Sequence, residues 1–346
     1  MDGPFIGVSG INDVDNPGPG VGVARSLKED AELRPRIVGL AYDAMEPGIY
    51  MDWVVDKSFI LPYPSGDGNA YVERLLYIKK THGLDAVIPN LDTELPIFIK
   101  HAATLADHGI RTFLPGMEQF RLRGKDRLSE IAGRIGMALP RTCVVNNLDR
   151  LLQAVNEIGL PVMVKGSFYK AYRCHTIQDA VAHYHDLVAE WGYPVIVQQV
   201  VAGDEMNVIG LGDGEGRSLG MVGIKKISIT ALGKIWTGVT VKNESTLAST
   251  ERFIREFGWR GPFELECIVS GDTVYLIEVN PRFPAWSYFA TGVGINLASR
   301  LVRSCLGLPV PAVPDYEAGK LFIRYTYELV TDMTKFQKAV TRGETP

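Results

Sequence analysis

The segment VYLIEVNPRF, residues 274–283, places two polar side chains in what is otherwise an apolar strand. Glu278 and Asn280 are two positions apart, so they lie on the same face of that strand. Arg282 follows two positions later, next to a proline. A carboxylate and an amide side by side can bind a cation, and a neighbouring arginine can bind a phosphate or a carboxylate through two hydrogen bonds.

The preceding segment, FELECIVS, brings further carboxylates to the same place. A three-residue turn at 271–273 gives a hairpin in which Glu266 lies opposite Glu278 and Glu264 lies opposite Asn280. Opposed carboxylates repel each other, and unpaired buried carboxylates are costlier still. Mg²⁺ relieves both effects, because it is commonly held by one or two carboxylates together with substrate phosphates. A polar face exposed to solvent is the alternative interpretation.

The elements that must position these residues begin with an alternating pattern. Short apolar segments bounded by glycine, proline or asparagine predict strands at residues 5–10, 36–43 and 85–90, with helices between and after them. Strands and helices in alternation are typical of a parallel sheet covered on both faces. We therefore expect an α/β domain at residues 1–118.

The remainder of the chain has a different pattern. Helical periodicity at residues 148–159 and 176–192 alternates with strand-like segments. After residue 203 strands dominate, which predicts an antiparallel sheet in an α+β domain. We expect two subdomains, residues 119–195 and 196–346, and the second ends in a tail that returns as a strand.

Together these motifs resemble the ATP-grasp superfamily. Its signature is a hairpin with Glu on one strand and Glu-x-Asn-Pro-Arg on the next, matched here by Glu266 and by residues 278–282. VIVQQVVAGDEMNV resembles the interdomain hinge of the family, VMVKGS its strand ending in a phosphate-binding lysine, and RGKDRL the start of its ATP-binding domain. The resemblance covers about residues 121–311, and the α/β unit before them is similar to the pre-ATP-grasp domain of the family.

The resemblance implies a fold and a set of roles. The expected fold is an N-terminal parallel-sheet pre-ATP-grasp domain followed by a two-subdomain ATP-grasp fold. Neighbouring residues of a strand point to opposite faces, so only one of Lys225 and Lys226 can face the site, and Lys225 is named as that one. The implied catalytic residues are Arg282 and Lys165, the implied metal ligands are Glu266, Glu278 and Asn280, and the implied nucleotide-binding residues are Lys125, Lys165, Gln198, Gln199, Val201, Glu205 and Lys225.

The activity that the resemblance implies is that of a carboxylate–amine ligase. Such enzymes transfer the γ-phosphoryl group of ATP to a carboxylate, and an amine then attacks the acyl phosphate. Phosphoryl transfer depends mainly on positioning and on neutralisation of charge, which lysines, an arginine and a bound metal ion supply. The expected cofactors are ATP and Mg²⁺, or Mn²⁺ in its place. The expected substrates are a small carboxylate and an amine of the amino-acid or peptide class, and a homodimer is compatible with this.

One segment departs from the family pattern. The family usually has a glycine-rich loop after the strand lysine, whereas Lys165 is followed by GSFYKAYRCHT with the single glycine Gly166. Ser167, Lys170 and Arg173 are candidates for part of the phosphate contacts that such a loop makes. Tyr169 and Tyr172 are either walls of the substrate pocket or exposed loop residues.

Composition excludes several classes of function. The chain has 346 residues, a net charge of −4 and 22% charged residues, so it has no electrostatic footprint for nucleic acid. No apolar run reaches the roughly 20 residues of a membrane span, and the N-terminus lacks a basic segment typical of secretion signals. Four widely spaced cysteines show no metal-ligand spacing. We expect a reduced protein of the cytoplasm that binds neither membranes nor nucleic acid.

Three alternatives remain open. A carboxylase or carbamoyl-phosphate-like enzyme would phosphorylate bicarbonate, and a nucleotide- or peptide-binding regulatory module would keep the fold without turnover. Gly18, Gly20 and Gly22 hint at an NAD-binding turn, although their G-x-G-x-G spacing favours a tight turn between a strand and a helix. Asp92 and Glu94 follow a predicted parallel strand and are either ligands for a substrate amine or surface carboxylates.

Overall fold

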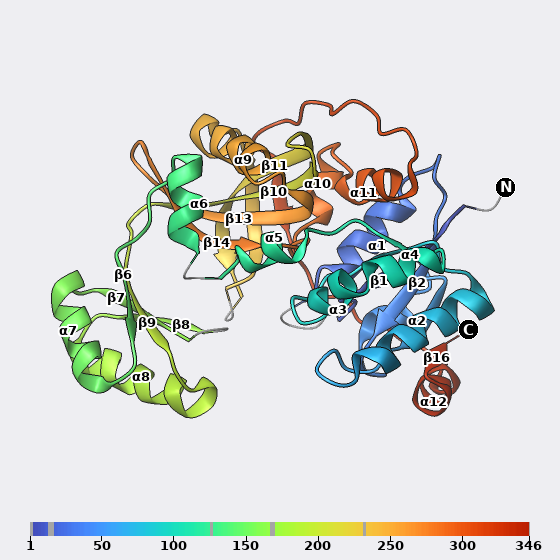
Figure 1. The fold of residues 1–346 in the computed structure, drawn as a ribbon, viewed down its shortest axis with the longest axis horizontal. Helices are drawn as coiled ribbons and strands as arrows, with labels where there is room; N and C mark the ends of the chain where they lie inside the picture. Colours follow the sequence, from blue (N-terminus) through green and yellow to red (C-terminus); the bar gives the residue numbers. More distant parts are fainter. Residues whose placement is uncertain (1–2, 13–16, 125–126, 167–169, 231–232, 346) are drawn as a thin grey trace.

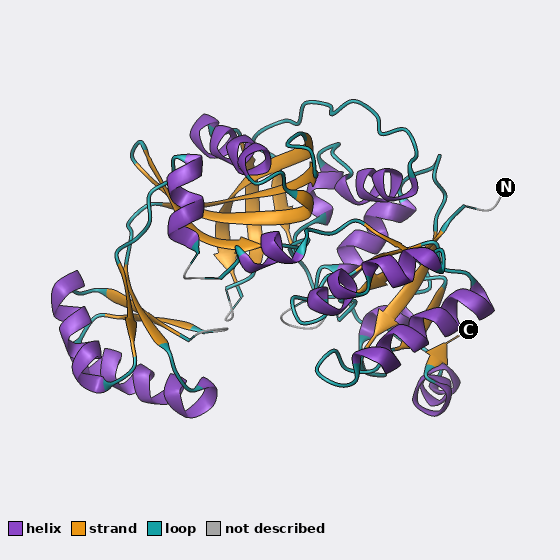
Figure 2. Ribbon diagram, in the orientation of Figure 1, coloured by secondary structure: helices purple, strands orange, loops and turns teal. Residues whose placement is uncertain are grey.

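The computed structural model describes residues 3–12, 17–124, 127–166, 170–230 and 233–345, and these residues form three β-sheets (Figures 1 and 2). Figure 1 shows one sheet at each end of the molecule and one between them. We call them the N-terminal sheet, the central sheet and the small sheet. None of the helices in the described part of the chain combines the length and the hydropathy that a membrane span requires.

The N-terminal sheet has the strand order β16-β3-β2-β1-β4-β5, parallel except for β16. Its strands are β1 (Phe5–Ser9), β2 (Arg36–Ala41), β3 (Lys57–Ile60), β4 (Ala86–Ile88), β5 (Arg111–Thr112) and β16 (Glu344–Thr345). The helices of this unit are α1 (Gly20–Lys28), the 3-10 helix η1 (Pro47–Tyr50), α2 (Gly68–His82), α3 (Leu95–Lys100), α4 (Ala102–Asp107), α5 (Met117–Arg121) and α12 (Met333–Arg342). The predicted parallel α/β unit is confirmed.

The small sheet is antiparallel, with the order β6-β9-β7-β8. Its elements are β6 (Thr142–Val145), α7 (Leu148–Ile158), β7 (Val162–Lys165), β8 (Ala171–Cys174), α8 (Ile177–Trp191) and β9 (Val195–Gln199). Side-chain caps fix the starts of both helices, because Asn147 accepts a hydrogen bond from the amide of Arg150 and Thr176 accepts one from that of Asp179. Both predicted helices are therefore confirmed, whereas β8 was not predicted.

The central sheet is antiparallel, with the order β14-β13-β10-β11-β12-β15. Its strands are β10 (Asp204–Asp213), β11 (Ser218–Ile229), β12 (Ile235–Val241), β13 (Arg260–Ser270), β14 (Thr273–Asn280) and β15 (Leu321–Ile323). The associated helices are α6 (Leu128–Ile135), α9 (Glu244–Glu256), α10 (Tyr288–Gly292) and α11 (Leu297–Leu306). The antiparallel sheet and the returning strand β15 are confirmed, and α9 was not predicted.

The two faces of the central sheet have different partners. We call the face that carries Glu264 and Glu266 the carboxylate face. The opposite face packs its apolar residues, Leu265 and Leu276 among them, against α6 and α9 in one hydrophobic cluster. Apolar residues of the carboxylate face, such as Ile209 and Ile224, share a cluster with α11 and with the N-terminal sheet. The polar residues of that face are therefore held between packed elements.

The C-terminal tail joins the first and last parts of the chain. After β15 it reaches α12, and β16 then pairs with β3 of the N-terminal sheet (Figure 1). The boundaries 1–118, 119–195 and 196–346 stay a prediction. β9 runs across the second of them, since Val195–Gln199 belongs to the small sheet.

A buried carboxylate ties together the ends of three parallel strands. Glu94 has no exposed surface and accepts hydrogen bonds from Ser9 at the end of β1 and from Tyr42 after β2. It also accepts bonds from the amides of Asn90 and Leu91 after β4, at 2.7 and 2.9 Å. Both sequence interpretations of Glu94, as a surface carboxylate and as an amine ligand, are wrong, because its oxygens are used inside the fold.

A second carboxylate close to this cluster should make stability depend on pH. Burial raises the pKa of Glu46 to about 7, because the hydrogen bonds from the amides of Tyr42 and Asp43 only partly offset it and the negative charge of Glu94 adds to it. The folded state therefore binds the proton more tightly than the unfolded chain. This contribution to the free energy of unfolding is complete at low pH and is lost as the pH rises from the unfolded value of 4.5 to about 7.

The Glu46→Gln variant should lose this slope. We expect the variant to gain about 2–3 kcal/mol relative to wild type between roughly pH 5 and pH 8, from 1.36 kcal/mol per pKa unit. Urea unfolding of both proteins at the two pH values measures the difference. Glu73→Gln, a change at an exposed position of α2, is the matched control and should show no such difference. Parallel curves for wild type and Glu46→Gln would contradict the prediction.

Candidate active site

In the hairpin of β13 and β14, Glu266 pairs with Glu278 as predicted, but the turn and the strand register between them differ from the prediction. Its turn has two residues, Gly271 and Asp272, so Ser270 pairs with Thr273 instead of Val274. A bulge beyond Glu266 then adds one residue to β14, and Glu266 lies opposite Glu278 as predicted. The turn is one residue shorter than predicted, and the bulge adds one residue that was not predicted. The two differences offset each other only in the part of the hairpin beyond the bulge, which carries the carboxylates.

Among the carboxylates of this hairpin, Glu264 accepts hydrogen bonds from three other side chains of the protein. It is 4% exposed and accepts hydrogen bonds from Asn207 Nδ2 and Trp286 Nε1, both at 2.7 Å. Asn280 Nδ2 donates to Glu264 and to Glu266, at 3.1 Å in each case. Burial, with the neighbouring charge of Glu266, raises the pKa of Glu264. Glu264 therefore orients the side-chain amide of Asn280, which lies next to the opposed carboxylates of Glu266 and Glu278.

Lys226, and not Lys225, is the lysine of β11 on the carboxylate face. The Nζ atom of Lys226 lies 2.9 Å from Glu266 and 3.5 Å from Glu205, and its side chain is 9% exposed. Burial alone lowers the pKa of Lys226, but the attraction of Glu266 and Glu264 outweighs it and raises that pKa. Lys225 points to the opposite face, where it pairs with Asp204. The prediction that Lys225 faces the site is therefore corrected.

Arg282 is held by an acidic residue of the N-terminal unit. Its Nε donates to Asp92 at 3.0 Å, and Arg123 binds the other oxygen of Asp92 at 3.1 Å. The NH2 group of Arg282 donates to Asn280 Oδ1 at 3.4 Å. Asp92, which follows β4, is 16% exposed and is occupied by two arginines, so the interpretation as a surface carboxylate is wrong. Arg282 thus links the β13–β14 hairpin, through Asn280, to the N-terminal unit, through Asp92.

The predicted hinge connects two sheets, because β9 of the small sheet leads within four residues into β10 of the central sheet. Lys165 at the end of β7 donates to Gln198 Oε1 at 2.7 Å, and Gln198 in turn donates to Thr142. The side chain of Gln199 instead accepts a hydrogen bond from the amide of Arg141 at 3.2 Å. Lys165 and Gln198 are brought together, whereas Gln199 is used to join β9 to the segment before β6.

The segment after β9 brings an acidic residue back to the carboxylate face. Val201 is partly buried, and Glu205 is half-exposed beside Lys226. Gly203, between these two residues in the sequence, packs against the backbone of β13. A Cβ atom at this position would be 2.3 Å from the carbonyl oxygen of Val269. Glycine is required at this position because the two backbones approach too closely for any side chain.

Part of the predicted site cannot be placed. Lys125, Ser167 and Tyr169 lie outside the described residues. Tyr172 stacks on His183 of α8 with their ring centroids 4.0 Å apart, which makes it a packing residue of the small subdomain. Lys170 pairs with Glu190 at the surface.

The residues present fit a divalent cation bound together with a phosphorylated ligand. Among the described residues, no three His, Cys, Asp or Glu side chains are grouped closely enough to hold a metal by themselves. Two opposed carboxylates with an adjacent amide are nevertheless the donor set that Mg²⁺ uses when phosphates or water supply the other ligands. The carboxylate face carries Glu205, Glu264, Glu266 and Glu278, with Lys226 and Arg282 close enough to act on their charges.

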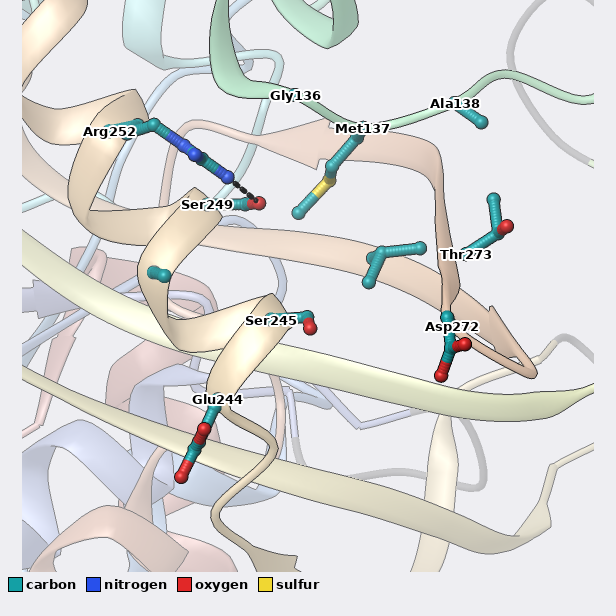
Figure 3. A pocket seen from close by; sticks show the side chains of 11 residues that line it. Gly136, Met137, Ala138, Glu244, Ser245, Ser249, Arg252, Asp272 and Thr273 are labelled. Atoms are coloured by element: carbon teal, nitrogen blue, oxygen red, sulfur yellow. Dashed lines mark hydrogen bonds between the residues drawn. The ribbon is translucent and has the colours of Figure 1, made fainter.

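A separate hollow lies on the opposite face of the central sheet. It has a volume of about 650 Å³ and is formed by the segment after α6, the first turns of α9 and the tip of the β13–β14 hairpin (Figure 3). Arg252 lies on the α9 side of the hollow and donates to Ser249 of the same helix at 2.9 Å (Figure 3). None of the predicted nucleotide or metal residues lines this hollow, so it is not the predicted site.

The sequence interpretation left the contacts of two site residues undetermined and missed a third residue. Lys226 was seen but assigned to the wrong face, because the strand register that orients it was not known. Asp92 was seen without its partner, since Arg282 is 190 positions away. Lys234 was not singled out; its Nζ donates to the carbonyl oxygen of Pro17 at 2.7 Å, and a lone lysine after a turn gives no signal in the sequence.

Part of the chain matches a known domain family. Residues 171–285 match the family model described as ATP-grasp domain. A solved N5-carboxyaminoimidazole ribonucleotide synthetase in complex with ADP is similar in fold, with a TM-score of 0.67 and 16% identity over 90% of this chain and 78% of that one. The same enzyme from Thermus thermophilus gives a TM-score of 0.63 and 16% identity over 89% and 79%.

A biotin carboxylase domain is similar in fold to the same degree. The domain dimer from the 2-oxoglutarate carboxylase of Hydrogenobacter thermophilus, solved with MgADP, ADP and bicarbonate, has a TM-score of 0.66 and 19% identity over 93% of this chain and 74% of that one. At these identities the likeness establishes the fold. The predicted architecture, a parallel-sheet domain followed by an ATP-grasp fold with antiparallel sheets, is confirmed.

Proposed function

We propose that this chain, which contains an ATP-grasp domain, is an ATP-dependent ligase that activates a carboxylate as an acyl phosphate for attack by an amine. The observation that supports this most directly is the carboxylate face, where Glu266 and Glu278 oppose each other beside Asn280, Lys226 and Arg282. Acidic and basic groups at such close range suit a metal–phosphate complex better than they suit a packed interior.

The proposed roles follow from the positions of the residues. Gln198, Gln199, Val201 and Glu205 lie along the hinge and would seat the nucleoside. Lys165, held by Gln198, would bind phosphate from the small subdomain, and Lys125 is proposed for the same role. Mg²⁺ held by Glu266, Glu278 and Asn280 would neutralise phosphate charge when bound. The proposal includes ATP as the nucleotide and Mg²⁺ as the metal ion. It also includes a homodimer as the assembly.

The proposed reaction has two steps. An oxygen of the substrate carboxylate forms a bond to the γ-phosphorus of ATP while the bond to the bridging oxygen breaks, and ADP leaves. The nitrogen of the amine then forms a bond to the acyl carbon, and inorganic phosphate leaves as the amine loses a proton. Arg282 is positioned by Asp92 and Asn280 to bind the oxygens of the transferring group, which gain charge in the transition state.

Bicarbonate is the second candidate for the carboxylate. The similar biotin carboxylase domain was solved with MgADP and bicarbonate. Bicarbonate is small enough to be bound by Arg282 without a further specificity pocket. A panel of substrates that contains bicarbonate and larger acids therefore distinguishes the two candidates. The regulatory-module alternative also remains distinct, because it binds ATP without turnover.

The test is ADP release by the full chain with Mg·ATP. The panel contains bicarbonate, amino acids, dipeptides and small mono- and dicarboxylic acids, each with and without an amine, and mass spectrometry identifies the products. We expect one carboxylate to stimulate ADP release and its amide to appear only when the amine is present. Stimulation by bicarbonate alone supports the second candidate, and ATP binding with no ADP release under any condition contradicts both.

A further inference from the structure

The central sheet ends in a strand with an open edge. β15 is the last strand in the sheet order and, within the described residues, pairs only with β12. The amide of Arg324 donates to the carbonyl oxygen of Trp236 at 2.9 Å. Because backbone groups alternate between the two sides of an antiparallel strand, those of Leu321 and Ile323 face away from β12. The described part of the chain provides no hydrogen-bond partner for them.

The side chains along this edge are apolar and exposed. Phe322 packs against Phe289, with ring centroids 5.3 Å apart, in the cluster on the carboxylate face. Side chains alternate along a strand, so Leu321 and Ile323 lie on the opposite face. The sequence continues this alternation with two tyrosines, and we call the four exposed residues the apolar row: Leu321 (56% exposed), Ile323 (61%), Tyr325 (73%) and Tyr327 (72%). Exposed apolar side chains beside an unpaired strand edge are typical of a surface that pairs with another chain.

The tail that carries the apolar row is anchored at both ends. At one end β15 pairs with β12, and at the other Lys335 of α12 pairs with Asp52 of the N-terminal unit. Between these points, the ring of Tyr327 contacts that of Trp53 edge to face, with centroids 6.2 Å apart. Trp53 is itself 56% exposed, so it extends the apolar surface onto the N-terminal unit.

A second copy of the same chain fits this edge in a two-fold arrangement. Outward-facing backbone groups of the two strands bond to each other, so odd-numbered residues lie opposite odd-numbered residues. With the two-fold axis at Arg324, Leu321 lies opposite Tyr327 of the second copy, and Ile323 lies opposite its Tyr325. Every member of the apolar row then meets another member. Residues 324–332 belong to no helix or strand in the single chain, so the pairing extends β15 without breaking an element.

The charges at the two ends of the apolar row are complementary in this register. Lys320 lies opposite Glu328 of the second copy, both residues are exposed, and two-fold symmetry forms the ion pair twice. An axis at Phe322 would instead place Lys320 opposite Arg324, which sets like charges against each other. An axis two residues further along than Arg324 would require Asp332 in the strand, where that residue caps α12.

We propose that a second copy of this chain docks along β15, antiparallel and about a two-fold axis at Arg324, so that the two central sheets join into one. The interface consists of backbone hydrogen bonds between the two edges, the paired apolar rows and the two ion pairs of Lys320 with Glu328. This inference goes beyond the proposed ligase function, which names a homodimer without its contact surface, and it does not depend on that function.

Sedimentation equilibrium of the full chain, from about 1 to 100 µM, tests the interface. We expect a wild-type dimer. Ile323→Lys should weaken dimerisation about a hundredfold or more, because two-fold symmetry makes each substitution remove buried apolar surface twice. Val144→Lys is the matched control: Val144 is 56% exposed on β6, at the edge of the small sheet, and its replacement should leave the dimer unchanged. Thermal unfolding checks that both variants fold.

A charge exchange tests the register at exposed positions, where substitutions leave the fold intact. Lys320→Glu and Glu328→Lys should each weaken dimerisation about tenfold, because like charges then lie opposite each other twice. The double variant Lys320→Glu/Glu328→Lys should restore dimerisation to within about threefold of wild type. Lys80→Glu, at an exposed position of α2, makes the same change elsewhere and should have no effect. The pair of Lys320 with Glu317 in the same chain is exposed and contributes little to these results.

Amide hydrogen exchange gives a readout of the backbone pairing itself. The amides of Leu321 and Ile323 should exchange more slowly in the wild-type dimer than in the diluted monomer, because the second copy accepts hydrogen bonds from them. Ile323→Lys should remove the dependence on concentration at Leu321. Slow exchange that is independent of concentration would contradict the pairing.

Three results overturn the proposal: a wild type that stays monomeric over the whole range, a dimer that Ile323→Lys leaves unchanged, and a double charge variant no better than its single parents. Failure of the ligase function looks different. A dimer that responds to the substitutions as expected, with no acid that stimulates ADP release, leaves the interface standing and the ligase function wrong. Stimulated ADP release from a monomer leaves the ligase activity standing and the interface wrong.

Discussion

The Glu278→Gln variant should release ADP about a thousandfold more slowly than wild type, within the range observed when one electrostatic stabiliser of a transition state is removed. Glutamine keeps the size of glutamate but has no charge, so it is a poor ligand for a hard cation. The fold should remain intact, because the change removes one of two opposed carboxylates and with it their repulsion. A coupled assay of ADP and thermal unfolding measure the two effects.

The matched control lies in the same hairpin. Asp272→Asn makes the same change of charge at the exposed turn and should leave both rate and melting temperature unchanged. Calorimetry with ATP gives a second readout, since wild type should bind ATP more tightly with Mg²⁺ than without, and Glu278→Gln should lose that difference. A variant that keeps more than about a tenth of the wild-type rate would show that Glu278 is not a metal ligand.

Replacing Lys226 by Met should reduce both stability and activity, whereas replacing Lys225 by Met should change neither. Lys226 is 9% exposed and neutralises Glu266 at 2.9 Å. Removing one partner of a buried ion pair leaves an uncompensated charge, and we expect a loss of about 3 kcal/mol in the free energy of unfolding. Lys225 and Asp204 form a half-exposed pair, whose loss should matter by less than about 1 kcal/mol.

This pair of variants differs only in the face of β11 that is changed. Urea unfolding gives the free energies, and ADP release with the identified substrate gives the rates, which should fall about a hundredfold in Lys226→Met alone. Added Mg²⁺ should restore part of the stability of Lys226→Met, because a divalent cation can replace the missing positive charge. Equal effects of the two substitutions would show that β11 does not have the orientation described here.

Much of the fold followed from local patterns. Alternating strands and helices predicted the parallel sheet of the N-terminal unit, and helical periodicity predicted α7 and α8 within a residue or two. Strands were missed where they are short or where they lack an apolar pattern. β8 reads AYRC, and β16 has two residues that form a strand only because β3 lies beside them.

The candidate site shows the same division. The types and spacing of Glu266, Glu278, Asn280 and Arg282 were sufficient to predict an acidic hairpin followed by a basic residue. Their pairing came out as predicted although the turn was wrong by one residue, since the bulge in β14 restored the register. A bulge depends on packing along the whole strand pair and leaves no local signal.

Charge compensation was decided by the tertiary structure alone. The sequence by itself determined which residues could do chemistry, because side-chain type and strand period are local properties. The partners of those residues come from far along the chain, as in the contact of Lys226 with Glu266, Asp92 with Arg282, and Lys234 with Pro17. Coulomb interactions and hydrogen bonds depend on distance in space. Strand pairing within the central sheet brings Lys226 to Glu266, and the packing of the N-terminal unit against the central sheet brings Asp92 to Arg282 and Pro17 to Lys234.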